Sequence, residues 1–330
     1  MTRQNRLRRI QRSGAGAALC ALLCLAGLLA VLPAALAGAG RTATPPKDLP
    51  GHHIALTVAD RAPVSLYYEE QGEGPPVLLL HGLGESSFTW HEIVPRLAER
   101  HRVIALDLKG FGRSEKPQDD DYSADDQAAL VARFIVAMKL DGVSLVGHSF
   151  GGTVALKAAL APEIIGTRRV GRIAAIGAPA LPGSTAPHLD LVKLPAVPDL
   201  VAQALSPEFL ARVLLSEAMG GTDDVNEQTI EGYAAPYREP EAMHAFLATA
   251  RSIVEEKDEK AVAKRLKQLR MPVLVVWCRK DPIVPLRAGR KLAAALPSAR
   301  LRIIDGCHHL PQHERPGRLV KVLEPFLRNR

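Results

Sequence analysis

Acidic residues are missing from the beginning of the chain, where none precedes Asp48. Five arginines lie within the first twelve residues, and no charged residue occurs between Ser13 and Gly40. The formal net charge of +7 therefore becomes 7 − 5 = +2 when the segment up to Ala37 is set aside. A charge this small and this dispersed argues against nucleic acid as a partner.

The basic start and the uncharged run have the form of an export leader. Residues 17–32 are rich in Leu and Ala, and Pro33 is followed by the small-residue sequence Ala35-Leu36-Ala37. This pattern predicts that residues 1–37 are a signal peptide cleaved after Ala37. The alternative is an uncleaved membrane anchor over residues 14–40, because the apolar run is long enough to cross a bilayer.

Both interpretations carry the rest of the chain across the cytoplasmic membrane. The protein is then periplasmic or secreted, or it is associated with the membrane through its N-terminal segment. Residues 38–51, which are rich in Pro, Thr and Gly, predict a flexible linker.

The sequence also lacks a metal-ligand pattern, because its histidines are not spaced as metal sites require. No internal repeat is present, and no low-complexity tract occurs beyond the leader. We therefore expect no metal and no other cofactor, and we expect surface or packing roles for the scattered histidines. These are His52, His53, His91, His101, His188, His244 and His313.

Apolar segments alternate with helical ones along the remaining chain, which predicts an α/β fold. The first two predicted strands alternate apolar and polar residues and form an antiparallel pair, and the others are buried parallel strands. The predicted strands are 53–59, 64–70, 76–80, 102–106, 143–146, 172–176, 272–277 and 300–304. The predicted helices are 89–100, 123–139, one running on through 153–156, 255–270, 286–296 and 316–328.

These elements predict a mostly parallel eight-stranded sheet with helices on both faces. Its core comprises residues 52–181 and 256–330. Prolines break the rhythm after Ala180, and we interpret residues 182–255 as a helical lid inserted into the core.

The pattern G-x-S-x-G occurs at Gly147, Ser149 and Gly151, between an apolar strand and an Ala/Leu-rich helix. A serine at the tip of such a turn has a strained backbone and an exposed hydroxyl, as a nucleophile requires. The small neighbours allow strand and helix to pass close together. The alternative is an ordinary glycine-rich turn, but the strand and helix on either side favour the nucleophile.

A nucleophilic serine needs a base, and the base needs a carboxylate that orients it. Ligands of such sheets bind at the carboxyl ends of the strands. Asp281 follows one late predicted strand, and the pair His308-His309 follows the last. The chain order Ser, Asp, His is the order expected in this architecture.

With these motifs the chain resembles the α/β-hydrolase fold superfamily, in its lid-bearing esterase and haloperoxidase-like branch. The resemblance covers about residues 58–326. The matching motifs are His81-Gly82-Leu83-Gly84, residues 107–117, residues 147–151, Asp281-Pro282 and residues 306–316.

The resemblance implies a catalytic triad of Ser149 as nucleophile, Asp281 as acid and His309 as base. His309 is selected over His308 by its distance from Glu314-Arg315-Pro316, although His308 stands where the family commonly has glycine. The backbone N–H groups of Leu83 and Phe150 would form the oxyanion hole. His81 and Gly82 would support its loop, and Asp107 would brace the glycine-rich loop that follows it.

Cys278 and Cys307 are the two cysteines outside the leader, and both are predicted just past neighbouring strands of this fold. In an oxidising compartment they could form a disulfide between the acid loop and the histidine loop. The preferred interpretation is two free, partly buried thiols.

The leading functional hypothesis is a serine hydrolase that cleaves carboxylic esters of small apolar molecules through an acyl-enzyme. A C–C bond, lactone, thioester or amide hydrolase, a perhydrolase, or an acyltransferase on the same triad is the alternative, because specificity depends on lid and pocket. A non-catalytic binding protein is least expected. A serine nucleophile disfavours epoxide hydrolase and haloalkane dehalogenase chemistry, which uses an aspartate there.

The apolar side chains of the predicted lid indicate a medium-sized apolar acyl or alcohol group. The alternative is that they form the lid's own small core. They are Leu205, Phe209, Leu214, Leu215, Met219 and Phe246.

Overall fold

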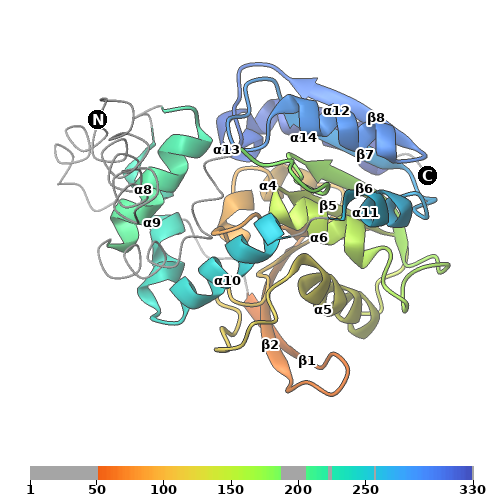
Figure 1. Cartoon of the computed structure of the whole chain (residues 1–330), viewed down its shortest axis with the longest axis horizontal. Helices are drawn as coiled ribbons and strands as arrows, with labels where there is room; N and C mark the ends of the chain where they lie inside the picture. Colours follow the sequence, from red (N-terminus) through yellow and green to blue (C-terminus); the bar gives the residue numbers. More distant parts are fainter. Residues whose placement is uncertain (1–50, 187–205, 222–224, 256–257, 329–330) are drawn as a thin grey trace, which may run out of the picture. The chain divides into compact units, whose positions relative to one another are not determined.

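The computed structural model describes residues 51–186, 206–221, 225–255 and 258–328 (Figure 1). The predicted signal peptide or anchor, residues 38–50 of the linker and residues 187–205 of the predicted lid lie outside these ranges. Among the helices in them, none combines the length and apolar character that a membrane span requires.

Eight strands form one sheet in the order β1-β2-β4-β3-β5-β6-β7-β8. The contacts of β2 with β1 and β4 are antiparallel, and all later contacts are parallel. The strands are β1 (Gly51–Leu56), β2 (Val64–Gln71), β3 (Pro76–Leu80), β4 (Arg102–Leu106), β5 (Val143–His148), β6 (Val170–Ile176), β7 (Val273–Cys278) and β8 (Ala299–Ile304). The predicted mostly parallel eight-stranded sheet is therefore confirmed.

Helices cover both faces of the sheet because successive strand residues point to opposite sides. Leu78 and Leu80 of β3 join one core, while Val77 and Leu79 join the other. The first core is covered by α5 (Ala124–Ala137), α6 (Phe150–Ala158), α11 (Glu259–Leu266) and α12 (Leu286–Ala295). The second is covered by α4 (Val94–Leu97) and α14 (Pro316–Arg328) (Figure 1).

The predicted helix over residues 89–100 is wrong. The chain forms a 3-10 turn, η1 (Ser87–Trp90), and then the single turn α4. Proline is favoured in the first turn of a helix and disfavoured in its interior, so Pro95 favours a helix start at α4. Upstream, the side chain of Ser86 accepts the Phe88 N–H and the Asp107 carboxylate accepts the Ser87 N–H, and both bonds fix the turn.

The predicted helix over residues 255–270 is shorter than expected. Its helical part is α11, whose first turn is capped by Asp258 through a 2.9 Å bond from the Ala261 N–H. Asp is among the preferred N-cap residues, so this carboxylate defines a new helix start.

Between β6 and β7 the described chain forms α8 (Pro207–Ala218), α9 (Glu227–Ala234), η3 (Ala235–Arg238) and α10 (Ala242–Glu255), here called the inserted helices. Leu215 and Tyr233 are buried in a small core of their own, which also takes in Leu310 from the loop after β8. Met219 packs against this core, whereas the Phe246 ring lies beside Gly84. Of the predicted apolar set, Leu215 and Met219 therefore belong to the helices' own core and Phe246 lies at the edge of the site, while Leu205 lies outside the described residues.

Candidate active site

Ser149 stands at the sharp turn between β5 and α6. Its backbone has φ 49° and ψ −120°, and φ is in the left-handed region that non-glycine residues avoid. The turn is held because the Ser149 N–H donates to the Ile176 carbonyl at 2.7 Å and its own carbonyl accepts the Gly152 N–H at 2.9 Å. The strained turn thus projects the hydroxyl beyond the end of the central strand.

The glycines on either side are required by close approach. A Cβ on Gly147 would lie 2.2 Å from the Gly151 carbonyl oxygen, and a Cβ on Gly151 would lie 2.3 Å from the carbonyl oxygens of Leu80 and His81. No side chain fits at these distances, so the spacing of the motif follows from packing.

The structure brings Ser149, His309 and Asp281 together. The Nε2 atom of His309 lies 3.1 Å from the Ser149 Oγ, and its Nδ1 atom lies 2.8 Å from the Asp281 Oδ2. All three side chains are almost fully buried. The arrangement can move a proton from the hydroxyl to the imidazole while the carboxylate fixes the ring.

Asp281 is itself held in place, since its Oδ1 accepts the N–H groups of Ile283 at 3.0 Å and Val284 at 2.8 Å. His308 does not enter the site. Its backbone N–H and its Nδ1 both contact the Glu314 carboxylate at 2.9 Å. Glu314 thereby fixes the turn in which His309 lies within hydrogen-bonding distance of Ser149, while His308 faces Glu314.

The loop after β3 is oriented by His81. Its Nε2 accepts the Leu108 N–H at 3.0 Å, so the ring proton is on Nδ1, which donates to the Gly82 carbonyl at 2.8 Å. Burial lowers the pKa of His81 and keeps the ring neutral in this role. In a trans peptide the N–H points opposite to the C=O, so the Leu83 N–H points away from His81.

The second predicted donor is the N–H of Phe150, the first residue of α6. A helix leaves its first N–H groups without partners inside the helix and carries partial positive charge there. This N–H is adjacent to Ser149 and is suited to an anionic oxygen formed on the serine's substrate.

Asp107 acts as the sequence predicts for this loop. Its Oδ1 accepts the Ser87 N–H and its Oδ2 accepts the Arg113 N–H at 2.8 Å. It lies between two loops as a brace and does not contact the triad.

Sequence reasoning missed two polar groups beside the site. Glu85 and His148 form a buried ion pair, discussed below. The hydroxyl of Tyr233, on α9, lies 2.7 Å from the Thr89 Oγ1 and 2.7 Å from the Nε2 of His313. His148 immediately precedes Ser149 in sequence, which was the available signal; Tyr233 and Thr89 are 144 residues apart and gave none.

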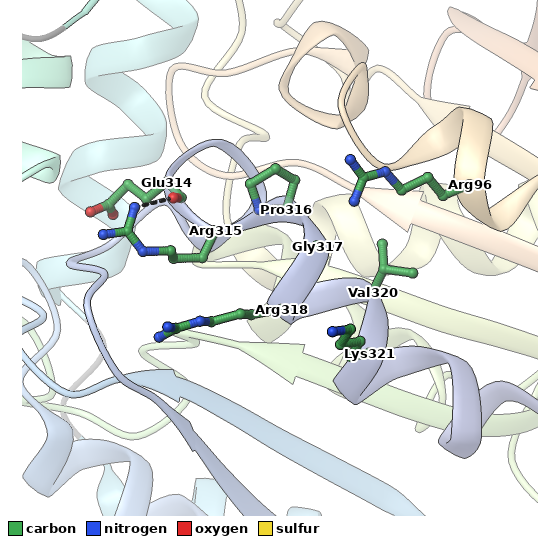
Figure 2. Close-up of a pocket in the computed structure, with 8 residues that line it drawn as sticks. All are labelled: Arg96, Glu314, Arg315, Pro316, Gly317, Arg318, Val320 and Lys321. Atoms are coloured by element: carbon green, nitrogen blue, oxygen red, sulfur yellow. Dashed lines mark hydrogen bonds between the residues drawn. The ribbon is translucent and has the colours of Figure 1, made fainter.

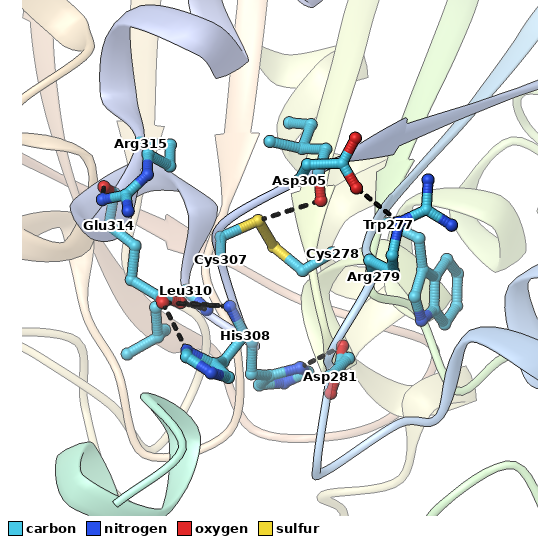
Figure 3. Close-up of a disulfide and its surroundings, with 12 residues drawn as sticks. Trp277, Cys278, Arg279, Asp281, Asp305, Cys307, His308, Leu310, Glu314 and Arg315 are labelled. Carbon is cyan, nitrogen blue, oxygen red and sulfur yellow. Dashed lines mark hydrogen bonds and ion pairs between the residues drawn. A yellow bond between two sulfur atoms is a disulfide. The ribbon is translucent and has the colours of Figure 1, made fainter. Parts of the chain in front are cut away.

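Cys278 and Cys307 form a disulfide, so the preferred prediction of two free thiols is wrong (Figure 3). Cys278 ends β7 opposite Ile304 of β8, and Cys307 follows three residues later. The Cα atoms are 5.3 Å apart, within the range a disulfide needs. The bond links the strand end before Asp281 to the loop that carries His309.

A separate open cavity of about 600 Å³ lies between α4 and the start of α14 (Figure 2). It is lined by the cationic residues Arg96, Arg315, Arg318 and Lys321 and by none of the predicted site residues. Within the described ranges, no group of three or more His, Cys, Asp or Glu side chains is placed to hold a metal ion.

A family model described as alpha/beta hydrolase fold matches residues 75–316. The chain belongs to this family. Esterases and a bromoperoxidase are among the solved structures that share the fold of this hydrolase, which confirms the resemblance inferred from the motifs.

The chain is similar to proteins of known and of unknown activity. An uncharacterized protein of Mycobacterium tuberculosis is 31% identical over 265 residues, 78% of this chain and 76% of that protein. The 2-hydroxy-6-oxo-6-phenylhexa-2,4-dienoate hydrolase of Comamonas testosteroni is 29% identical over 83% of this hydrolase and 95% of its own length. A thermophilic esterase from Thermogutta terrifontis superposes with a TM-score of 0.71 at 25% identity, covering 84% of this chain and 98% of that one.

Proposed function

We propose that this hydrolase cleaves carboxylic esters of small apolar molecules by nucleophilic attack of Ser149. The observation that carries the proposal is the contact series Ser149 Oγ, His309 Nε2, His309 Nδ1 and Asp281 Oδ2, with distances of 3.1 and 2.8 Å at a strained turn. Base and orienting carboxylate are the two groups that make a serine hydroxyl nucleophilic at neutral pH.

In the proposed reaction His309 accepts the hydroxyl proton as Ser149 Oγ bonds to the acyl carbon. The N–H groups of Leu83 and Phe150 stabilise the oxyanion. His309 then returns the proton to the leaving alcohol, and an acyl-enzyme remains. Water attacks the acyl-enzyme with His309 again as base, and Ser149 is regenerated.

The inserted helices are proposed as the lid that shapes the acyl pocket. Support comes from Phe246, whose ring lies beside Gly84 in the loop of the proposed oxyanion hole. The Tyr237 hydroxyl lies beside the same glycine, so this side of the proposed pocket combines an apolar ring with one polar group, and the ring favours an apolar acyl or alcohol group.

The test is hydrolysis of a chain-length series of p-nitrophenyl esters by residues 38–330. Ser149→Ala is expected to lose activity by several orders of magnitude. Ser144→Ala, a buried serine on the same strand, is the matched control and should retain it. Ester turnover by Ser149→Ala at the wild-type rate would refute the mechanism.

C–C bond hydrolysis on the same triad is the second candidate. It is favoured by the 29% identity to the Comamonas testosteroni hydrolase over most of both chains. Wild-type protein that is inactive on the ester series but cleaves a 2-hydroxy-6-oxohexa-2,4-dienoate, with loss of activity in Ser149→Ala, would select it. If the protein acts on esters and on the dienoate, the substrate with the higher kcat/KM identifies the preferred reaction. Lactones belong in the same comparison.

We also propose that the protein is exported, with residues 1–37 as signal peptide or residues 14–40 as anchor. The Cys278–Cys307 disulfide supports this, because disulfides persist in oxidising compartments. Mass spectrometry of the protein from its native cell separates the cases: a mature N-terminus at Gly38 indicates cleavage, and an intact leader in the membrane fraction indicates an anchor. An intact leader in the cytosolic fraction would refute export.

A further inference from the structure

Glu85 and His148 form a buried ion pair in contact with His309 of the candidate active site. The Nδ1 atom of His148 lies 2.8 Å from the Glu85 Oε1, and the side chains are 0% and 8% exposed. Neither residue belongs to the proposed triad or the proposed oxyanion hole. Burying two charged groups costs desolvation free energy even when they are paired, so the pair calls for an explanation.

His148 lies between two acceptors. Its other ring nitrogen, Nε2, lies 2.8 Å from the backbone carbonyl oxygen of His309, and Glu85 faces Nδ1. A neutral imidazole carries one N–H and would turn a lone pair toward one of these oxygens. The two oxygens therefore favour a proton on each nitrogen, that is, an imidazolium with Glu85 as its counter-charge.

The electrostatics of the pair agree with this assignment. Burial is the largest single influence on Glu85 and by itself would raise its pKa, but the charge and contact of His148, the Gly82 N–H and the charge of His81 together lower the pKa to about 2. Burial would likewise lower the pKa of His148, but the Glu85 carboxylate and the His309 carbonyl raise it.

The pair also reaches the oxyanion loop. The second carboxylate oxygen of Glu85, Oε2, accepts the Gly82 N–H at 3.0 Å. Gly82 immediately precedes Leu83, and His309 is the base. One ion pair is thus bonded at one end to the loop of the proposed oxyanion hole and at the other to the residue that would take the serine proton.

We propose that Glu85 and His148 are positioning residues, an ionic brace that holds the oxyanion loop and His309 in register around Ser149. This inference rests on the proposed function, because it assigns the brace to the Ser149 site. An offset of about 1 Å between reacting groups is enough to cost roughly 100-fold in rate, so a brace between loops that are more than 200 residues apart in sequence has catalytic value.

The brace has a pH dependence that a purely structural pair would not impart to the reaction. It is intact between the lowered pKa of Glu85 and the raised pKa of His148. Above the latter the ring loses a proton, and one of its two contacts becomes a repulsion between lone pairs. Besides Glu85, which is in direct contact, the more distant Asp281 carboxylate also raises the pKa of His148. The His309 ring lies 4.8 Å from the His148 ring, centroid to centroid, and His81 and His313 also interact electrostatically with His148.

The experiment uses the rate at which a fluorophosphonate labels Ser149, which needs the nucleophile and its base but no particular substrate. We expect His148→Ala and Glu85→Ala to label roughly 10- to 100-fold more slowly than wild type. The double variant should be no slower than the worse single variant, because the two residues act as one unit. The control Glu92→Gln, an exposed acid between β3 and β4, should label normally.

Glu85→Gln supplies the discriminating readout. Its amide can accept from Gly82 and donate to a neutral His148, so the contacts persist without the charges. We expect wild-type labelling to decline at alkaline pH as His148 loses its proton, and the Glu85→Gln profile to lack this decline. Circular dichroism and thermal melts confirm that each variant is folded.

The outcomes separate the brace from the proposed function. Folded His148→Ala and Glu85→Ala that label at the wild-type rate would overturn the brace and leave the serine hydrolase proposal intact. An identical alkaline decline in wild type and Glu85→Gln would also overturn it. A wild-type protein that neither reacts with fluorophosphonate nor hydrolyses any ester would instead refute the proposed function.

Discussion

The backbone N–H of His309 donates to the carbonyl of Ala218, the last residue of α8, at 2.8 Å. The residue proposed as base is therefore hydrogen-bonded to the inserted helices as well as to Asp281 and Ser149. Leu310, the next residue, is buried in the core of those helices. A displacement of α8 is expected to displace the loop that carries His309, the proposed base, with it.

Gly220, just beyond α8, tests this connection. A Cβ there would lie 2.5 Å from the His308 ring, next to His309. We predict that Gly220→Ala lowers kcat roughly 10-fold or more, because the clash shifts the loop. Gly221→Ala is the matched control: its φ of +83° imposes similar backbone strain, but its Cβ would meet no described atom within 4 Å. Equal kcat values in the two variants would contradict the prediction.

The Cys278–Cys307 disulfide closes a loop with a sequence separation of 29 residues. By the chain-entropy estimate, removing it in Cys278→Ala/Cys307→Ala is expected to lower the free energy of unfolding by about 3 to 4 kcal/mol. Guanidinium unfolding of wild type with and without reductant checks the value. Reductant should destabilise the wild type but leave the double variant unchanged, and a wild type insensitive to reductant would refute the prediction.

Ser149 is expected to trade stability for function. A non-glycine residue at φ 49° and ψ −120° is strained, and glycine is not. We predict that Ser149→Gly raises the free energy of unfolding by about 1 to 3 kcal/mol while abolishing ester hydrolysis. Ser149→Ala keeps the Cβ and should be inactive without this gain. Calorimetry measures the Tm of the two variants. An equal Tm would show that the backbone strain at residue 149 has no measurable cost in stability.

His313 should contribute to acid sensitivity. Burial lowers its pKa to about 3, from an ordinary value near 6.5, so the folded protein holds it neutral. Its stabilising contribution is fully present above about pH 6.5. Between about pH 6.5 and 3 the unfolded chain binds a proton at this residue that the folded protein does not bind, so the contribution is lost as the pH falls through this range. His313→Gln is expected to flatten the stability profile over this range. The exposed His52→Gln serves as control and should keep the wild-type slope.

Much of the fold followed from local signals. The solid apolar runs at 76–80 and 102–106 coincide with β3 and β4, because strands buried on both faces carry no polar alternation. Of the two failed helix predictions, the one over residues 255–270 overlooked the local N-cap Asp258, whereas the other involves a contact distant in sequence. The interruption of the predicted helix at 89–100 depends in part on the carboxylate of Asp107, which no window around residue 89 contains.

The site divides in the same way. Ser149 and its glycines are a continuous motif whose spacing reflects steric contact, so sequence locates it. Glu85 follows β3 and His148 ends β5, and the two side chains meet because these strands are neighbours in the sheet. The cysteines illustrate the limit most directly: the neighbouring strands were predicted, but the register that places Cys278 opposite Ile304 was not.

In the described sheet β8 is an edge strand, with β7 as its neighbour, and His309 follows it, whereas Ser149 follows β5 in the middle. Edge strands open first in local fluctuations, so the backbone amides near His309, the proposed base, would otherwise exchange faster than those near Ser149, the proposed nucleophile. The disulfide ties the end of β7 to the exit from β8 and prevents that end from opening alone. The protection of backbone amides near His309 from hydrogen exchange should then approach that of the central strands. On heating, activity should be lost at the same temperature at which the fold unfolds.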